Sequence, residues 1–200
     1  MNIFLTSQAS EVLDRIATML PVDPKDLKVV LIPTASDPYK EHPWIDADRA
    51  KLKDFGFQVA DFDLKNKTEE ETRKTLSKFD VIFVAGGNAF YLLNEAKKSG
   101  FLEVAKELVS AGKVYIGSSA GSYIACPTIE MAGWKNPNKN RFGLKDLSAL
   151  NLVNFLVTAH YTDKFEEAVA EGKKSTKYKV LTLTDKQFIH FDGNNYKILT

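Results

Sequence analysis

A short segment around Ser119 has the spacing of a nucleophile elbow. Gly117 and Gly121 lie two residues before and after Ser119, which gives the pattern Gly-x-Ser-x-Gly. A β-rich run (114–116) precedes it and a helix-compatible run (122–125) follows, the strand–turn–helix context in which this pattern exposes a serine hydroxyl. In so tight a turn, a Cβ at either glycine would collide with neighbouring backbone. The pattern favours Ser119 as a nucleophile over the alternative, a small-residue turn that only begins a helix.

A serine nucleophile needs a base to accept its proton, and histidine is the usual base. The chain has three histidines. His42 precedes a proline in a polar loop and is expected at the surface, and His190 alternates within a predicted strand, which indicates packing or exposure. His160 ends an apolar run, and in a parallel sheet it would lie at the same carboxyl edge as Ser119. We therefore expect His160 to be the base.

The third member of a serine triad is a carboxylate that orients the histidine. Asp185 follows the run 181–184 at the end of a predicted strand, a position that suits a side chain reaching back to His160. The alternatives are that Asp185 is an ordinary turn residue or that another acid takes this role. The other candidates are Asp163, Asp146, Asp192 and Glu130.

Attack on a carbonyl group also needs hydrogen-bond donors for the developing oxyanion. The β-rich run 81–85 ends in Gly86, Gly87 and Asn88, after which a helix is expected. Glycine amides at a helix N-terminus suit an oxyanion and equally resemble a phosphate-binding turn, although neither common glycine-rich nucleotide motif occurs. We expect the N–H groups of Gly87 and Ala120 to be the donors, and Gly86 and Asn88 to contact the substrate.

The composition restricts the possible partners. The 200 residues include 27 basic and 26 acidic side chains, a formal net charge of +1, which gives no electrostatic reason to expect nucleic acid or an anionic membrane surface. Cys126 is the single cysteine, so no internal disulfide forms, and the dispersed histidines offer no metal-ligand spacing. Residues 1–6 read as a first strand, and no apolar run approaches the roughly 20 residues of a membrane helix. We expect a cytoplasmic protein that uses no metal or cofactor.

Short β-rich runs alternate with longer amphipathic runs along the chain. The predicted strands are residues 3–6, 28–33, 57–62, 81–85, 113–116, 152–157, 180–183, 188–191 and 196–199. The predicted helices between the early strands are residues 10–20, 46–55, 68–79, 88–98 and 101–111. This alternation predicts a mostly parallel sheet flanked by helices on both faces, and the closely spaced last strands predict an antiparallel C-terminal portion. Two long loops, 33–38 and 134–147, are expected within a single α/β domain spanning residues 1–200.

Three blocks of the sequence together resemble peptidase family S51, which includes cytosolic aspartyl dipeptidases (peptidase E) and cyanophycinases. Residues 82–93 are similar to its glycine-turn block, residues 115–121 to its serine block, which continues in residues 125–129, and residues 157–163 to its histidine block. The blocks occur in the family's order, and the resemblance runs over most of the chain.

The resemblance implies a class I glutamine-amidotransferase-like fold in which serine replaces the elbow cysteine. It also implies a Ser-His-Glu triad whose acid lies in a strand-end turn after the histidine. On this chain the nucleophile position falls on Ser119, the base on His160 and the acid on Asp185, so an aspartate stands where the family usually has a glutamate.

One feature of the aspartyl dipeptidases is missing from the sequence. Those enzymes carry an arginine after the histidine block that receives the substrate's aspartate carboxylate. Residues 164–179 contain no arginine, and Lys164, Lys173 and Lys174 offer point charges rather than a planar two-pronged donor. We therefore expect poor cleavage of peptides that begin with aspartate.

We interpret the sequence as a serine peptidase of small peptide substrates, dipeptidase-like, acting as a monomer or homodimer. One alternative is an esterase using the same nucleophile. A typical α/β-hydrolase would place its acid between Ser119 and His160, where Asp146 is the main aspartate. The other alternative is an amidotransferase-like binding module that is catalytically inactive.

Overall fold

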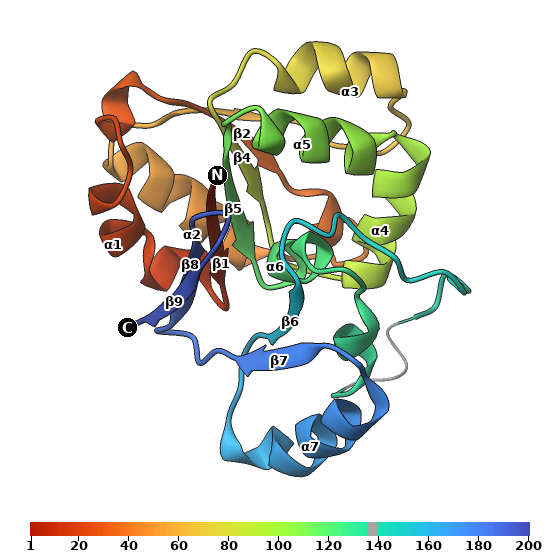
Figure 1. Cartoon of the computed structure of the whole chain (residues 1–200). Helices are drawn as coiled ribbons and strands as arrows, with labels where there is room; N and C mark the ends of the chain where they lie inside the picture. The colour runs from red at the N-terminus through yellow and green to blue at the C-terminus, as the bar shows by residue number, and fades with distance from the viewer. Residues whose placement is uncertain (136–139) are drawn as a thin grey trace.

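The centre of the molecule is a seven-stranded sheet in the order β3-β2-β4-β5-β1-β8-β9 (Figure 1). The structure is a computed structural model that describes residues 1–135 and 140–200, so residues 136–139 of the second predicted loop lie outside the described residues. The strands are β1 (Asn2–Thr6), β2 (Lys28–Ile32), β3 (Gln58–Asp61), β4 (Val81–Val84), β5 (Val114–Ser118), β8 (Phe188–Phe191) and β9 (Tyr196–Leu199).

The first five strands of this sheet pair in parallel. β8 pairs antiparallel with β1, and β9 pairs antiparallel with β8. The predicted architecture, a mostly parallel sheet with an antiparallel C-terminal portion, is thus confirmed. Parallel pairing brings the carboxyl ends of β1, β4 and β5 to one edge, where loops gather functional groups.

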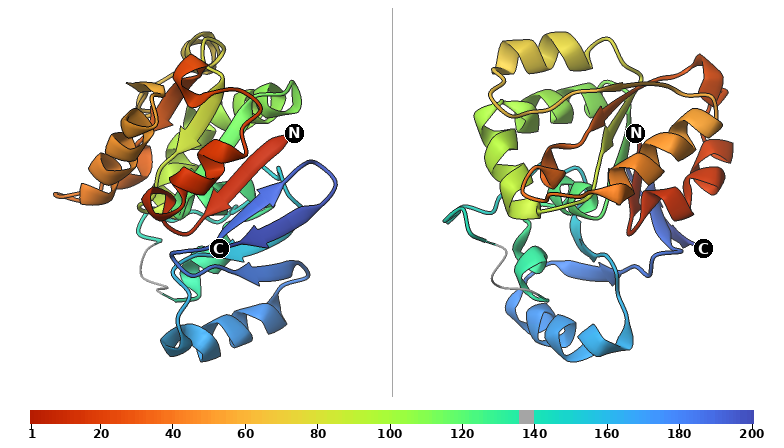
Figure 2. Two further views of the ribbon diagram at one scale, coloured as in Figure 1. Left: turned by 90° about the vertical axis from the view of Figure 1, so that its left-hand side faces the viewer. Right: turned by 180° about the vertical axis from the view of Figure 1, so that it is seen from behind.

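Helices cover both faces of the sheet (Figures 1 and 2). On one face lie α1 (Leu13–Thr18) and α2 (Pro43–Asp54), and on the other lie α3 (Glu69–Leu76), α4 (Ala89–Lys98) and α5 (Phe101–Ser110). The predicted helix 10–20 is divided into a short 3₁₀ turn, η1 (Ala9–Glu11), and α1. Within the described residues, no helix has the length and apolar character needed to cross a bilayer.

The two faces of the central strands belong to two separate hydrophobic clusters. In β2, Val30 and Ile32 pack with α4 and α5, whereas Val29 and Leu31 pack with α1 and α2. Successive strand side chains point to opposite faces, so a strand covered on both sides needs an unbroken apolar run. This requirement explains why β2 and β4 are apolar without alternation, and it makes the sheet a rigid base for the loops at its edge.

The chain leaves the main sheet after β5 and forms a second, smaller one before it returns in β8. β6 (Phe155–Thr158) and β7 (Lys179–Thr182) pair in parallel, joined through α7 (Glu166–Ser175), and they lie below the main sheet in Figure 1. The strand that precedes His160 was expected in the main sheet, but β8 already pairs with the available edge of β1. The apolar side chains of β6 pack against the short helix α6 (Ala120–Ala125) instead.

Candidate active site

Ser119 occupies the tight turn between β5 and α6. Its backbone is strained, with φ of 49° and ψ of −103°, a conformation that a residue other than glycine seldom adopts. A Cβ on Gly121 would lie 1.9 Å from the carbonyl oxygen of Val84, and one on Gly117 would lie 2.6 Å from the carbonyl of Gly121. The N–H of Ser119 donates to the carbonyl of Thr6 at 3.0 Å. Helix, strand and turn therefore approach so closely that only glycine fits on either side of the serine.

His160 reaches Ser119 from the small sheet. Its Nε2 lies 3.1 Å from the Ser119 Oγ, although the two residues belong to different sheets. Two hydrogen bonds fix its turn, since the N–H of Ala159 donates to the Tyr123 hydroxyl at 3.1 Å and the N–H of His160 donates to Ser7 Oγ at 2.6 Å. His160 itself has a positive φ of 54°, a backbone conformation that residues other than glycine seldom adopt.

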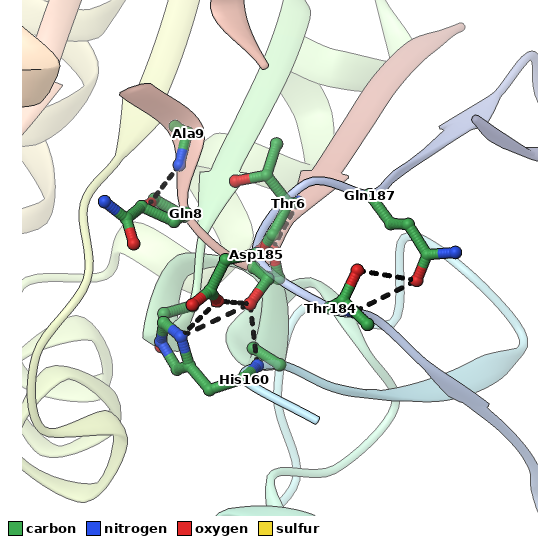
Figure 3. Close-up of polar contacts among 12 residues, drawn as sticks. Thr6, Gln8, Ala9, His160, Thr184, Asp185 and Gln187 are labelled. Atoms are coloured by element: carbon green, nitrogen blue, oxygen red, sulfur yellow. Dashed lines mark hydrogen bonds and ion pairs between the residues drawn. The ribbon is translucent and has the colours of Figure 1, made fainter. Parts of the chain in front are cut away.

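Asp185 completes a line of three side chains. Its Oδ1 lies 2.6 Å from His160 Nδ1 and also accepts a hydrogen bond from the Ser7 hydroxyl at 2.6 Å. Figure 3 shows Asp185 and His160 facing each other across these contacts. Burial raises the pKa of Asp185, but the Ser7 hydrogen bond, His160 and the charge of Lys135 outweigh burial and lower the pKa below its usual value. The carboxyl group is therefore held as a carboxylate facing the histidine ring.

Ser7 is the member of this arrangement that the sequence did not reveal. It follows β1 directly and is fully buried. Its hydroxyl bonds Asp185, 178 residues away, and accepts from the His160 amide, 153 residues away. The available signal was its position, because the carboxyl end of β1 lies beside that of β5 in a parallel pair. A serine at a strand end is too common to indicate a role by itself.

The other acids considered from the sequence have different partners. Asp146 pairs with a lysine of α4 at 2.7 Å, and Glu130 accepts from a threonine after α7 at 2.5 Å. Asp192 accepts two backbone N–H groups in the turn between β8 and β9. Asp163 begins a 3₁₀ turn, η6 (Asp163–Phe165). Within the described residues, Asp185 is the carboxylate that bonds His160.

The other two histidines lie away from this line of side chains. His42 is exposed before α2, with its ring edge-on to Trp44 at 6.4 Å between centroids. His190 in β8 stacks on Phe4 at 4.7 Å, and burial lowers its pKa. Neither histidine lines the cavity that contains Ser119.

The glycine turn between β4 and α4 lies beside the nucleophile. A Cβ on Gly86 would come within 3.4 Å of Ser119 Cβ, and one on Gly87, with φ of 144°, would lie 2.2 Å from the carbonyl oxygen of Ala35. Asn88 caps α4, where its Oδ1 accepts the N–H groups of the second and third helical residues. Asn88 does not line the cavity with its neighbours, so its contact with substrate stays a prediction. The turn therefore places the backbone of Gly86 and Gly87, which carries no side chains, beside Ser119.

A cavity of about 370 Å³ opens at this edge of the sheet. Its lining includes Ser119, His160, Gly86, Gly87, Tyr39 and Trp44. The Trp44 indole N–H donates to the carbonyl of Gly86 and to the Ser36 hydroxyl, both at 3.1 Å, which fixes the indole ring against the glycine turn. Ala120 begins α6, and the first N–H of a helix has no partner within the helix. The cavity itself joins Ser119, His160 and the glycine turn of Gly86 and Gly87 in a space suited to a small ligand, and Ala120 is not among its lining residues.

The fold, together with the glycine-turn, serine and histidine blocks of the sequence, defines a peptidase of a known family. The family model for peptidase family S51 matches residues 3–199. The chain belongs to peptidase family S51.

Individual relatives agree with this assignment. An uncharacterized peptidase of Listeria innocua is 33% identical over 198 residues, which cover 99% of this chain and 91% of the relative. An uncharacterized peptidase of Listeria monocytogenes is 35% identical over 162 residues, 81% of this chain and 78% of the relative. Peptidase E of Salmonella newport is 35% identical over 102 residues, covering 50% of this chain and 40% of that enzyme.

Two solved structures share the fold. A provisionally named peptidase E protein from Listeria monocytogenes superposes with a TM-score of 0.87 and 31% identity, covering 99% of this chain and 97% of that one. This match confirms the class I glutamine-amidotransferase-like fold. A peptidase from an acI-B1 actinobacterium has a TM-score of 0.69 at 13% identity, covering 99% and 86% of the two chains, and shows a similarity of fold alone.

Proposed function

We propose that this peptidase is of the serine type and hydrolyses short peptides, with Ser119 as nucleophile, His160 as general base and Asp185 as the acid of the triad. The observation that carries the proposal is the 3.1 Å separation of His160 Nε2 and Ser119 Oγ. It lies within the hydrogen-bond reach that proton transfer requires. The 2.6 Å contact of His160 Nδ1 with Asp185 supports the tautomer that carries its proton on Nδ1 and leaves Nε2 free to accept.

In the first half of the reaction, Ser119 Oγ attacks the carbonyl carbon of the scissile bond and gives its proton to His160 Nε2. The carbonyl oxygen becomes an oxyanion, which accepts hydrogen bonds from the N–H groups of Gly87 and Ala120. Collapse of this intermediate breaks the C–N bond. His160 returns the proton to the departing amine, and the acyl group remains on Ser119 as an ester.

In the second half, water attacks the ester carbonyl while His160 accepts one of its protons. The second intermediate releases the carboxylic acid, and Ser119 Oγ recovers its proton from His160. Asp185 stabilises the imidazolium that forms twice in the cycle. In this scheme Ser7 is a positioning residue, because it holds the His160 backbone and the Asp185 carboxylate at the same time.

We do not expect the enzyme to prefer peptides whose first residue is aspartate. Among the described residues that line the cavity there is no lysine or arginine, and a dedicated carboxylate site needs a fixed cation. We expect kcat/KM for Asp-Leu to be no higher than for Ala-Leu or Leu-Leu. A preference for Asp-Leu of about 10³-fold, the size expected of a site built for that charge, would contradict this expectation.

A fluorophosphonate probe and a matched substrate panel test the proposal. We expect the probe to label the protein on Ser119, and we expect Ser119→Ala to abolish labelling and lower dipeptide hydrolysis by about 10³-fold or more. Ser118→Ala is the matched control for labelling, since that serine directly precedes the elbow serine and its Oγ accepts from the Ala9 N–H, whereas His160 Nε2 lies against Ser119 Oγ. Absence of labelling would favour a binding module. Cleavage of esters without any dipeptide would favour an esterase.

A further inference from the structure

The catalytic cavity contains a carboxyl group that the proposed hydrolysis does not use. Asp48 of α2 is 1% exposed, yet it lines the same cavity as Ser119 and His160. Its Oδ1 accepts the N–H of Ser10 at 2.9 Å. Its Oδ2 is buried and has no hydrogen-bond partner among the described residues. A buried carboxyl oxygen without a partner is costly, so a hydrogen-bond donor supplied by a ligand would stabilise it.

Asp48 lies close to the nucleophile. Ser10, whose amide it accepts, follows Ala9, and the Ala9 amide donates to Ser118 Oγ at 3.2 Å. Asp48 and Ser118 thus accept from consecutive amides of the 3₁₀ turn η1, and Ser118 immediately precedes Ser119. The hydroxyl of Ser118 lies within hydrogen-bond reach of the Asp48 carboxyl group, and this contact opposes the rise that burial causes in the pKa of Asp48. The carboxyl group is therefore near the position of a scissile carbonyl.

The rest of the cavity suits a cation rather than an anion. Among the described residues that line it, Asp48 is the one carboxylate, and lysine and arginine do not occur. The wall also carries two aromatic rings, Tyr39 and Trp44, edge to face at 5.5 Å between centroids. A carboxylate with neighbouring aromatic rings is the combination that recognises alkylammonium groups.

We propose that Asp48 binds a primary ammonium group of the substrate, an inference that rests on the proposed peptidase function. The α-ammonium of a peptide's first residue is two bonds from the scissile carbonyl carbon of a dipeptide, which matches the closeness of Asp48 to the nucleophile. A lysine side chain presents the same chemistry at greater length. The bound ammonium gives Asp48 Oδ2 the donor that it lacks, and any proton on the carboxyl group passes to water as the ion pair forms.

Binding to the Ser119→Ala protein tests this inference without requiring turnover. Calorimetry at pH 6 compares Ala-Leu with N-acetyl-Ala-Leu, and Nα-acetyl-lysine amide with its Nε-acetylated form. We expect the free ammonium of one pair to bind at least about tenfold more tightly than its acetylated partner, the size of a charge-assisted hydrogen bond. The pair that shows the difference identifies the source of the ammonium. Equal binding within both pairs would overturn the inference.

Two variants in the Ser119→Ala background assign the effect to Asp48. Asp48→Asn should bring the two members of the responding pair to similar affinity. Asp54→Asn, on an exposed position of the same helix, should leave the preference as it was. Titration in two buffers should also show about one proton released per peptide bound, and Asp48→Asn should remove that release, which separates Asp48 from His160 as its source. A preference that persists in Asp48→Asn would overturn the assignment. The affinities of the free and acetylated ligands are compared on Ser119→Ala protein with Asp48 intact. This comparison therefore tests the inference even if Asp48→Asn fails to fold.

Discussion

Ser119 and His160 face each other at 3.1 Å, but different interactions fix them. The Ser119 turn is held by steric contact, since glycines on both sides let β4, β5 and α6 approach to distances that no side chain allows. His160 is held by hydrogen bonds to groups far away in the chain, and its side chain and that of Asp185 remain 47% and 48% exposed. The nucleophile is therefore fixed by the close packing of strands and helix, and the base and acid are fixed by hydrogen bonds, of which Ser7 makes two and Tyr123 makes another.

The largest effect is expected from a change that removes the steric fit around Ser119. In Gly121→Ala the new Cβ would lie 1.9 Å from the Val84 carbonyl oxygen, so α6 or β4 must move. We expect a loss of about 3 kcal/mol or more in unfolding free energy, measured by urea denaturation, together with loss of fluorophosphonate labelling. Gly133→Ala is the control, because its nearest contact would be 3.8 Å from Phe90. Wild-type labelling by Gly121→Ala would show that the elbow tolerates a larger residue.

The second effect concerns the base, His160, which is held by hydrogen bonds rather than by close packing. His160→Ala should lower kcat/KM for dipeptides by about 10³-fold, with little loss of stability because the side chain is about half exposed. His42→Ala and His190→Ala should retain activity per folded molecule, since neither lines the cavity. Steady-state kinetics with thermal melting on all three proteins makes the comparison. Activity in His160→Ala within tenfold of wild type would refute its role as base.

The same contrast decides what the sequence could reveal. The turn around Ser119 was predictable because its constraint is local, with two glycines, a strand before and a helix after all lying within a dozen residues. The parallel sheet was predictable because strands buried on both faces must be apolar throughout. The place of β6 was not, because it depends on β8 pairing with β1, a competition between segments about 30 residues apart. Ser7 was missed for a similar reason, since its two partners are 153 and 178 residues away.

A smaller effect is expected when the link between base and acid is removed. Ser7→Ala deletes the hydroxyl that donates to Asp185 and accepts from the His160 amide. We expect kcat to fall by about tenfold. Because the Ser7 hydrogen bond helps to keep the pKa of Asp185 low against burial, the pKa of Asp185 should rise in this variant.

The pH profile separates positioning from a merely structural role. The Asp185 carboxylate must be ionised to hold His160, so activity in Ser7→Ala should be lost at a higher pH on the acid side than in the wild type. Ser7→Thr keeps a hydroxyl and should restore most of the rate and the wild-type acid limb. A drop in rate with an unshifted acid limb would mean that Ser7 contributes only to packing.

The last effect is expected in the stability of the protein at Asp48, because substitution there changes the charge of a buried group that lines the cavity. Burial raises the pKa of Asp48 from 3.8 to about 7. Between these values the unfolded chain has released the proton and the folded chain keeps it, so this group makes unfolding free energy fall as pH rises, by about 1.4 kcal/mol per unit. Asp48→Asn should therefore be more stable than wild type at pH 8, by roughly 1–3 kcal/mol after allowing for imperfect amide contacts, with a smaller difference at pH 5.

Urea denaturation at both pH values, with Asp54→Asn as control, measures this difference. A pH dependence unchanged by Asp48→Asn would mean that the folded state does not hold the Asp48 proton. Thermal melting with a bound peptide gives a second test. An ammonium group bound at Asp48 stabilises the ionised carboxylate that burial disfavours. Ala-Leu should thus raise the melting temperature of Ser119→Ala protein more at pH 8 than at pH 5, and N-acetyl-Ala-Leu should not. Substrate binding would then stabilise the protein through Asp48, whereas the position of His160 depends on its hydrogen bond to Ser7 whether or not substrate is bound.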